Sequence, residues 1–280
     1  MILVADSGST KTDWRLAGKE GMVKAVRTIG LNPFHKNFEE IKNLIREDLL
    51  PQTKGSNVNQ IYFYGAGCAS EDTCLVLSKA LRVSFPNAAI EVNSDLLGAA
   101  RALCNRQAGI ACILGTGSNS CYFDGEKIKH SIPPLGYILG DEGSGTFMGK
   151  KLLTDYLRKE IPEELAEKLR SEPGMSKMII LEKIYKENTP ARYLSGFALF
   201  IHENRNEPYM HKLVYNSFSA FMESIIKKYE GFNQIKIHFV GGIAYSFSDI
   251  LREVTSECGL YIGNIFKNPI ESLTNFHLHS

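Results

Sequence analysis

Two short stretches of the chain place glycine and hydroxylated residues directly after an apolar run. The first is Gly8-Ser9-Thr10-Lys11, which comes after the apolar residues 2–5 and Asp6. The second is Gly115-Thr116-Gly117-Ser118, which follows the apolar residues 110–114. Backbone N–H groups and small side chains allow anionic oxygens to approach closely, so both turns are candidates to bind phosphate groups. An ordinary polar hairpin turn is the alternative interpretation of each.

Asp6 stands beside the first of these turns, where its carboxylate would repel a bound phosphate. A divalent cation between the two removes that conflict, and Mg²⁺ commonly bridges carboxylates and phosphates. Lys11 adds one positive charge to the same turn. We therefore expect Asp6 to lie at a magnesium site next to a polyphosphate.

The apolar pattern around these turns predicts alternating strands and helices in two consecutive halves. Residues 1–104 are predicted as βββαβαβα. The order of a strand (110–114), a Gly-containing turn and a returning strand (121–123) then occurs a second time. This repetition indicates an internal duplication of supersecondary structure. Such alternation predicts two α/β domains with mixed sheets covered by helices on both faces. The predicted helices are 38–50 (ended by Pro51), 71–83, 95–104, 146–159, 163–169, 175–186, 191–202, 209–229, 247–258 and 269–276.

The predicted domains are residues 1–112 and 113–266, and the C-terminal helix, residues 267–280, is a candidate to complete the first. In open α/β sheets, ligands bind past the carboxyl ends of the strands. We expect the residues at such ends to meet in a cleft between the two halves. These residues are Asp6, Gly67, Asp95, Gly115 and Gly241.

Composition limits the classes of function. The chain has 280 residues, of which 44% are hydrophobic and 22% are charged, as is typical of a folded globular protein. Its net charge of +1 does not indicate binding to nucleic acid or to an anionic membrane surface. We expect no membrane span, because no apolar run approaches the roughly 20 residues required. The absence of a secretion signal and the six scattered cysteines without a CxxC pair predict reduced thiols and a cytoplasmic location.

Six motifs carry a resemblance to a known superfamily over nearly the whole chain. DSGSTKT (6–12), LGTGSN (114–119) and VGGIA (240–244) resemble the two phosphate loops and the adenosine loop of the actin-like ATPases. This superfamily includes actin, heat-shock chaperones and hexokinase-like sugar kinases. The resemblance implies two ribonuclease H-like domains with a nucleotide cleft between them, and ATP with Mg²⁺ as cofactors.

Three further stretches resemble one branch of that superfamily. GLNP (30–33), NSD (93–95) and GDEGSG (140–145) are similar to motifs of the branch that contains the BadF/BadG/BcrA/BcrD ATPases and N-acetylglucosamine kinase. Pro134-Leu135 stands where the eukaryotic-type N-acetylglucosamine kinases carry Gly-Trp, so the resemblance leaves the exact sugar open.

The resemblance also implies a role for individual residues. Asp6 would hold Mg²⁺ through water, and Asp95 would be the general base. Asn32 and Asp141 would bind sugar hydroxyls, with Gly67 near the acyl-amino group. The implied nucleotide-binding residues are Gly8, Ser9, Thr10, Lys11, Gly115, Thr116, Gly117, Ser118, Gly241, Gly242 and Ala244, and Thr116 is also expected at the substrate.

Each of these polar residues has a simpler interpretation. Asp95 and Asp141 both lead into predicted helices, where the helix dipole favours an acid. Asn32 precedes a proline and is typical of a turn. For Asp95, the position at a rigid junction of strand and helix also suits a carboxylate that accepts a proton from an alcohol.

The leading interpretation is an ATP-dependent sugar kinase acting on an amino sugar such as N-acetylglucosamine. The second is an ATPase that activates a 2-hydroxyacyl-CoA dehydratase-type enzyme; such proteins share an iron–sulfur cluster across a dimer through cysteines. The third is a nucleotide-binding regulator without catalysis. We expect a small-molecule sugar as partner, no nucleic acid and no membrane, and a homodimer is a further possibility.

Overall fold

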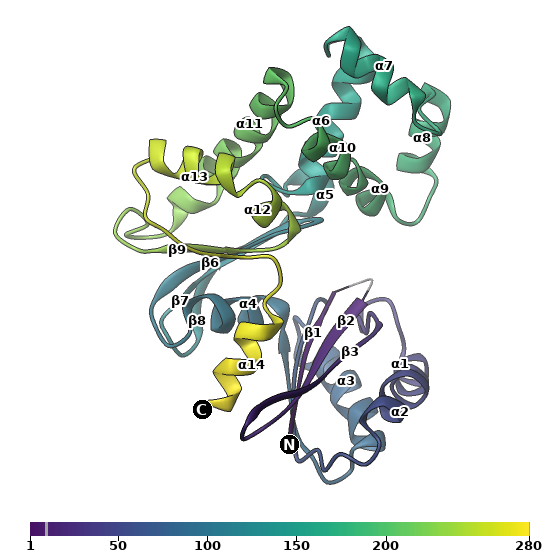
Figure 1. Ribbon diagram of the computed structural model, residues 1–280, viewed down its shortest axis with the longest axis vertical. Coiled ribbons are helices and arrows are strands. Elements are labelled where there is room, and N and C mark those ends of the chain that lie inside the picture. Colours follow the sequence, from purple (N-terminus) through teal and green to yellow (C-terminus); the bar gives the residue numbers. More distant parts are fainter. Residues whose placement is uncertain (9–10, 280) are drawn as a thin grey trace. The chain divides into compact units, whose positions relative to one another are not determined.

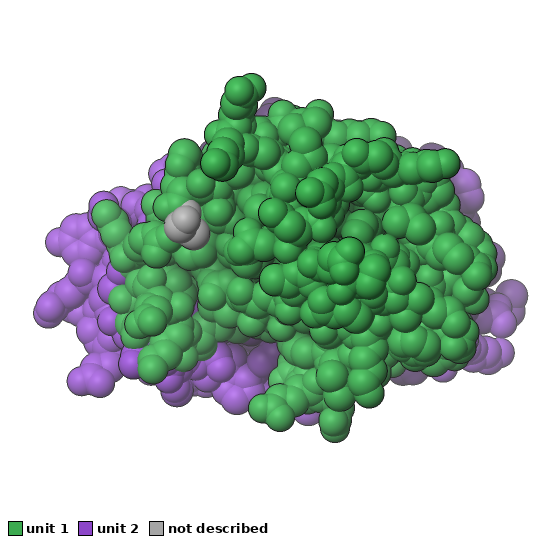
Figure 2. Space-filling model, turned by 90° about the horizontal axis from the view of Figure 1, so that it is seen from below, with its two compact units in different colours: residues 1–107, 123–128, 268–280 green, residues 108–122, 129–267 purple. Residues whose placement is uncertain are grey.

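The computed structural model describes residues 1–8 and 11–279 and divides into two compact units (Figure 1 and Figure 2). The first unit contains residues 1–107, residues 123–128 and the segment from residue 268 onward. The second contains residues 108–122 and 129–267. Each unit is built on one five-stranded sheet. The functional domain boundaries at residues 112 and 266 remain a prediction.

The sheet of the first unit is mixed, as predicted. Its strands lie in the order β3-β2-β1-β4-β5. β1 is antiparallel to β2 and parallel to β4, and β4 is parallel to β5. Parallel pairing brings the carboxyl ends of β1, β4 and β5 to one edge of the sheet. The strand bounds are β1 (Ile2–Ser7), β2 (Lys11–Gly18), β3 (Gly21–Ile29), β4 (Gln60–Gly65) and β5 (Ala89–Ser94).

One face of this sheet packs against α1 (Phe38–Leu44) and α3 (Glu71–Ser84), over a core that includes Trp14 and Phe63. Past α1 the chain continues as a π-helical segment, η1 (Ile45–Leu49), and then as a further helical turn, α2. The helix therefore does not end at Pro51, as the sequence suggested. Pro51 lies in the first turn of α2 (Leu50–Thr53), where a missing N–H is tolerated.

The opposite face is covered by α4 (Asp95–Cys104) and α14 (Ile270–Leu278), which contact each other. Val4 and Tyr64 pack against these two helices, whereas Leu3 belongs to the core on the other face. The division follows from the alternation of side chains along a strand. Ser94 caps α4 by accepting a hydrogen bond from the Leu97 N–H, so this helix begins where the sequence predicts.

The second sheet repeats the layout of the first. Its order is β10-β9-β6-β7-β8, with β6 parallel to β9 and β9 parallel to β10. In both sheets the first strand lies between its hairpin partner and a later parallel strand. The predicted duplication of strand order is confirmed. The strand bounds are β6 (Gly109–Leu114), β7 (Ser118–Phe123), β8 (Ile128–Ile132), β9 (Ile237–Val240) and β10 (Ile262–Phe266).

The helices of the second unit differ from the predicted ones in several places; the predicted helix 209–229, for example, ends at Ser224 and is followed by the separate turn η2. The predicted helix 191–202 is two helices, α9 and α10, which meet at Phe197. A short helix, α5, also precedes GDEGSG, where no helix was predicted. The bounds are α5 (Gly136–Leu139), α6 (Gly145–Arg158), α7 (Glu163–Ser171), α8 (Lys177–Tyr185), α9 (Pro190–Gly196), α10 (Ala198–Glu203), α11 (Pro208–Ser224), η2 (Ile226–Lys228), α12 (Gly242–Ser246) and α13 (Ser248–Glu257).

The second unit has a larger hydrophobic core than the first. It joins the inward side chains of β6 and β9 to those of α6, α11 and α13 and includes Phe218, Phe221 and Phe239. Among the described helices, none combines the length and the apolar character that crossing a membrane requires.

Helix α6 packs very closely against α9. At Gly149, a Cβ atom would lie 2.0 Å from the backbone oxygen of Leu194. Because a main-chain atom blocks the position, Gly149→Ala should separate the two helices and lower the free energy of unfolding by about 1–3 kcal/mol. Urea denaturation followed by circular dichroism measures this.

Gly196→Ala, at the end of α9, is the matched control, because a Cβ there would meet no atom within 4 Å. If both variants kept the wild-type denaturation midpoint, the close approach of α6 and α9 would be wrong.

His277 of α14 is enclosed by aromatic and charged groups of the first unit. Its ring stacks on Tyr62 with 3.6 Å between centroids, and its Nε2 lies 2.8 Å from the Tyr64 hydroxyl. Burial lowers the pKa of His277 to about 4; the positive charges of Arg101 and Arg106 also lower it, while Glu91 raises it.

This depressed pKa predicts an acid-sensitive fold. The unfolded chain, with a histidine pKa of about 6.5, takes up its proton first as the pH falls. The contribution is therefore complete above about pH 6.5 and is lost progressively toward pH 4, with about 2 kcal/mol gone at pH 5. Urea midpoints at pH 7.5 and pH 5 should show this loss for the wild type and a smaller one for His277→Gln. Equal losses in both proteins would contradict the assignment.

Candidate functional site

The first predicted phosphate turn connects β1 to β2. The Gly8 N–H donates to the Lys11 carbonyl (3.0 Å). Ser9 and Thr10 lie outside the described residues, so their predicted roles have no structural account. The Lys11 ammonium lies 2.8 Å from Asp13, whose other oxygen accepts from Arg27. Lys11 is thus held at the turn by an ion pair.

Two partly buried carboxylates, Asp6 and Asp95, lie near each other in the first unit. Asp6 is close to the end of β1, and Asp95 begins α4 directly after β5. The pKa of Asp6 is raised to about 7, mainly by burial and then by the charges of Asp95 and Asp13, against the opposing effect of Lys11. Burial also raises the pKa of Asp95, although N–H groups at the start of α4 lower it.

This electrostatic setting can accept a cation. The charge of Asp95 raises the proton affinity of the nearby Asp6, and a divalent ion would neutralise this excess of negative charge. Among residues 1–8 and 11–279, no group of three or more His, Cys, Asp or Glu side chains could hold a metal. A site with one or two carboxylates is what Mg²⁺ uses when water and phosphate supply its remaining ligands.

Asn32 and Gly67 come together in the first unit. Asn32 is buried, and its Oδ1 accepts from the Phe34 N–H (2.9 Å), as in an Asx turn. Gly67 has a φ of +85°, and a Cβ at this position would lie 2.1 Å from Asn32 Oδ1. Asn32 thus forms a turn, its role at the sugar stays a prediction, and the same side-chain carbonyl requires glycine at position 67.

The second predicted phosphate turn is tied to the start of α6. The Gly145 and Thr146 N–H groups donate to the Gly115 and Thr116 carbonyls, at 2.9 and 3.1 Å. β7 begins at Ser118 rather than at residue 121, where the sequence placed it, so Ser118 belongs to the strand. The end of GDEGSG and the start of α6 thus hold this turn in place through backbone hydrogen bonds.

Asp141 links this turn to α6 through its side chain. Its carboxylate accepts from the Ser118 N–H (3.2 Å) and from the Thr146 hydroxyl (3.4 Å). Burial raises the pKa of Asp141, and these two hydrogen bonds oppose it. The residue has a φ of +62°, a backbone conformation that non-glycine residues rarely adopt and that often marks functional sites. At Gly117 a Cβ would lie 3.0 Å from Asp141 Oδ2, so glycine is needed beside it.

The predicted adenosine loop lies against the same turn. Gly241 has a φ of +128°, and a Cβ there would lie 2.2 Å from the Leu114 carbonyl oxygen. Gly242 is open, since a Cβ would meet no atom within 4 Å, and it starts α12. Ala244 is fully buried in the core. The turn after β6 and the loop after β9 therefore meet at the carboxyl ends of two parallel strands, where α/β sheets bind ligands.

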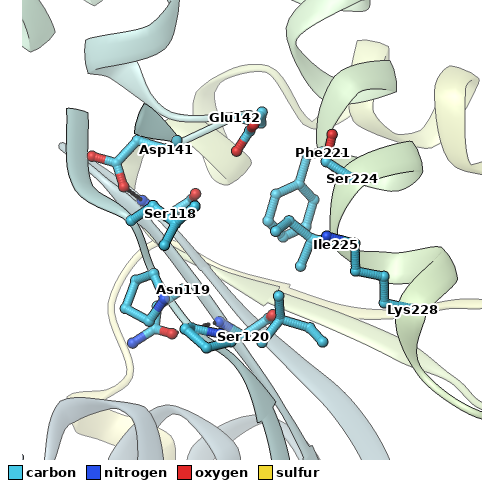
Figure 3. A pocket seen from close by; sticks show the side chains of 14 residues that line it. Ser118, Asn119, Ser120, Asp141, Glu142, Phe221, Ser224, Ile225 and Lys228 are labelled. Atoms are coloured by element: carbon cyan, nitrogen blue, oxygen red, sulfur yellow. Dashed lines mark hydrogen bonds between the residues drawn. The ribbon is translucent and has the colours of Figure 1, made fainter. Parts of the chain in front are cut away.

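A pocket of the second unit opens beside this arrangement (Figure 3). Figure 3 shows Ser118 and Asp141 together on one side, with Phe221 and Lys228 on the other. The Tyr229 hydroxyl supports the wall by hydrogen bonds to Ser120 Oγ (2.7 Å) and the Ile132 N–H (3.2 Å). The lining residues are Ser118, Asn119, Ser120, Ile132, Pro133, Pro134, Leu135, Gly140, Asp141, Glu142, Phe221, Ser224, Ile225 and Lys228.

Several of these residues were missed by the sequence interpretation. Asn119 and Glu142 lie inside the motifs LGTGSN and GDEGSG, so the motifs contained the signal for them. Phe221 and Lys228 come from α11 and η2, far along the chain, and no local pattern marks them.

Comparison with known proteins gives matches among solved structures, whereas no family model and no curated protein matches the chain. A candidate N-acetylglucosamine kinase from Porphyromonas gingivalis is 41% identical, with a TM-score of 0.96 over 100% of this chain and 99% of that one. A second candidate N-acetylglucosamine kinase, from Chromobacterium violaceum, is 14% identical, with a TM-score of 0.68 over 100% of this chain and 98% of that one.

The fold is also that of an actin-like ATPase. A non-polymerising mutant of MamK bound to AMPPNP has a TM-score of 0.54 at 13% identity, over 99% of this chain and 97% of that one. The duplicated sheets agree with this likeness, and the relative from P. gingivalis matches along the full chain. The chain belongs to the N-acetylglucosamine kinase-like branch of the actin-like ATPase superfamily.

Proposed function

We propose that the protein is an ATP-dependent sugar kinase that phosphorylates an amino sugar such as N-acetylglucosamine. The observation that carries this proposal is the pair Asp6 and Asp95, which combines a candidate cation ligand with a candidate base at one sheet edge. The relative that is 41% identical, a candidate N-acetylglucosamine kinase, supports the choice of substrate class.

Phosphoryl transfer depends mainly on positioning and on neutralising charge. Asp6 would hold Mg²⁺ through water, and the ion would neutralise the charge that develops on the phosphate oxygens. The phosphates would lie against the turn that includes Gly8 and Lys11 and against the turn 115–118, with Ser9 and Thr10 assigned by resemblance only. The Gly8, Gly115 and Ser118 N–H groups already donate within the protein, so the N–H groups of Thr116 and Gly117 would be the donors of the second turn. Gly241, Gly242 and Ala244 would pack against the adenosine.

Asp95 would accept the proton of the attacking sugar hydroxyl. Its pKa is raised by burial, which makes the carboxylate a stronger base, and the N–H groups of Asp95 and Leu96 hold its orientation. Asn32 and Gly67 in the first unit, and Thr116 and Asp141 in the second, would bind the sugar. The positive φ and the two hydrogen bonds of Asp141 would keep that carboxylate fixed before substrate arrives.

Other assignments remain predictions of the same proposal. They include membership of the BadF/BadG/BcrA/BcrD family, a cytoplasmic location and a homodimer. ATP hydrolysis without any sugar dependence would favour the dehydratase activator, and nucleotide binding without turnover would favour the regulator.

A screen of Mg-ATP with a panel of sugars tests the proposal by coupled detection of ADP. We expect an amino sugar to accelerate ADP release, and Asp95→Asn to lower kcat by about 10²–10⁴-fold while the affinity for ATP is unchanged. The matched control is Asp249→Asn, because Asp249 is also an acid in the first turn of a helix but is exposed on α13. Full activity of Asp95→Asn would contradict the assignment of Asp95 as general base. A loss of ATP affinity as large as the loss of kcat would also contradict it.

Gly67→Ala tests the sugar site separately. A methyl group would displace the Asn32 amide, so we expect the KM for the sugar to rise about tenfold, equivalent to about 1.4 kcal/mol, with little change for ATP. Gly55→Ala is the control, because Gly55 has nearly the same φ (+84°) but no atom within 4 Å of its Cβ position. Both variants share the backbone strain. A similar sugar KM in the two would mean that Asn32 does not bind the sugar.

A further inference from the structure

A second cavity of the second unit lies between α6 and α11 and contains none of the residues assigned to the kinase reaction. Its volume is about 590 Å³, within the range of about 300–1,000 Å³ found for small-molecule sites. Its apolar wall is formed by Phe147, Met148 and Leu213. The other lining residues are Lys150, Lys151, Thr154, Asp155, Tyr209, Lys212, Asn216 and Ser217. We call this cavity the α6–α11 groove.

The groove carries an excess of positive charge. Its one carboxylate, Asp155, pairs with Lys151 (2.8 Å) and accepts from the Tyr209 hydroxyl (2.6 Å). Burial opposes its ionisation, but these two hydrogen bonds outweigh burial and lower the pKa of Asp155. One lysine is therefore neutralised. The groove keeps the charge of Lys212 and that of Lys150, which also acts on Asp141 outside the groove.

These two lysines present their charge differently. The Lys150 ammonium donates to the Tyr137 carbonyl (3.0 Å) and lies 5.7 Å from the centre of the Phe147 ring. A carbonyl and an aromatic face orient the ammonium without cancelling its charge. Lys212 is exposed and forms no ion pair with any residue in the described ranges 1–8 and 11–279. An anion in the groove would meet one oriented and one exposed cation.

Ser217 supplies an independent sign that the groove is built for a ligand. The residue is 1% exposed, and within the described part of the chain its hydroxyl has no hydrogen-bond partner. A buried hydroxyl without a partner costs about 1–3 kcal/mol, so such groups in native proteins call for an explanation. Ser217 lies one helical turn after Leu213 on α11, and both line the groove.

We propose that the α6–α11 groove is a binding site for a small organic anion with an apolar body. The apolar part packs on Phe147, Met148 and Leu213, and the anionic group lies within reach of Lys150 and Lys212. Binding gives the Ser217 hydroxyl a polar neighbour. This site is independent of the sugar kinase proposal, because it uses other residues and holds whether or not the protein transfers phosphate.

Two fluorescent probes of similar shape test this proposal on the full-length protein. Anilinonaphthalene sulfonate is an amphipathic anion, and phenylnaphthylamine is its neutral counterpart. We expect saturable binding of the anionic probe with one site per chain and weaker binding of the neutral probe. Lys212→Met should weaken the anionic probe about tenfold and leave the neutral probe unchanged, since only the charge is removed.

Lys177→Met, which changes an exposed lysine of α8 away from the groove, is the matched control and should bind the anionic probe like the wild type. Ser217→Leu should block both probes by filling the wall, with circular dichroism as the check on folding. If Ser217→Leu does not fold, the probe affinities of Lys212→Met still test the proposal. Absence of saturable binding, equal affinity for both probes, or wild-type affinity in Lys212→Met would each overturn the proposal.

Discussion

The repulsion between two partly buried carboxylates is the constraint on which the candidate site depends. The charge of Asp95 raises the proton affinity of Asp6, so a flexible framework would let the two carboxylates separate. The parallel register prevents this. Asp6 pairs with Tyr64 of β4, and Tyr64 pairs with Asn93 of β5, two residues before Asp95. Three hydrogen-bonded strands and the start of α4 thus hold like charges near one another.

The two units use one strand order for different purposes. In the first, the ends of parallel strands carry carboxylates, which suit a cation and a proton acceptor. In the second, the corresponding ends carry glycines, and the loop at Gly241 fits directly against the Leu114 carbonyl because it has no side chain. The duplicated fold thereby separates groups that attract a cation from backbone groups that attract anionic oxygens.

Much of the fold could be predicted because its signals are local. The apolar runs of the strands, the glycine turns and the Ser94 cap of α4 all act within a few residues, and their elements lie where expected. The π-helical segment η1, the break at Phe197 and the short helix α5 could not be predicted, because packing between distant segments decides them.

The same distinction applies to the candidate site. Asp141 and the turn 115–118 were named from motifs, but the hydrogen bonds between them join segments far apart in sequence. Phe221 of α11 and Lys228 of η2 line the pocket together with residues of β7, which are far away in the sequence, and helical periodicity alone gives them no special meaning. The motifs could therefore indicate some residues of the candidate site, whereas the distant residues that contact them could not be predicted from the sequence.

The place of α14 has a consequence for biosynthesis. This helix covers Val4 and Tyr64 of the first sheet, yet it is translated after every strand of the second unit. Domains fold as units while the ribosome is still adding residues. The first sheet therefore leaves the ribosome with one apolar face incomplete and must stay soluble in that condition while the other unit is made.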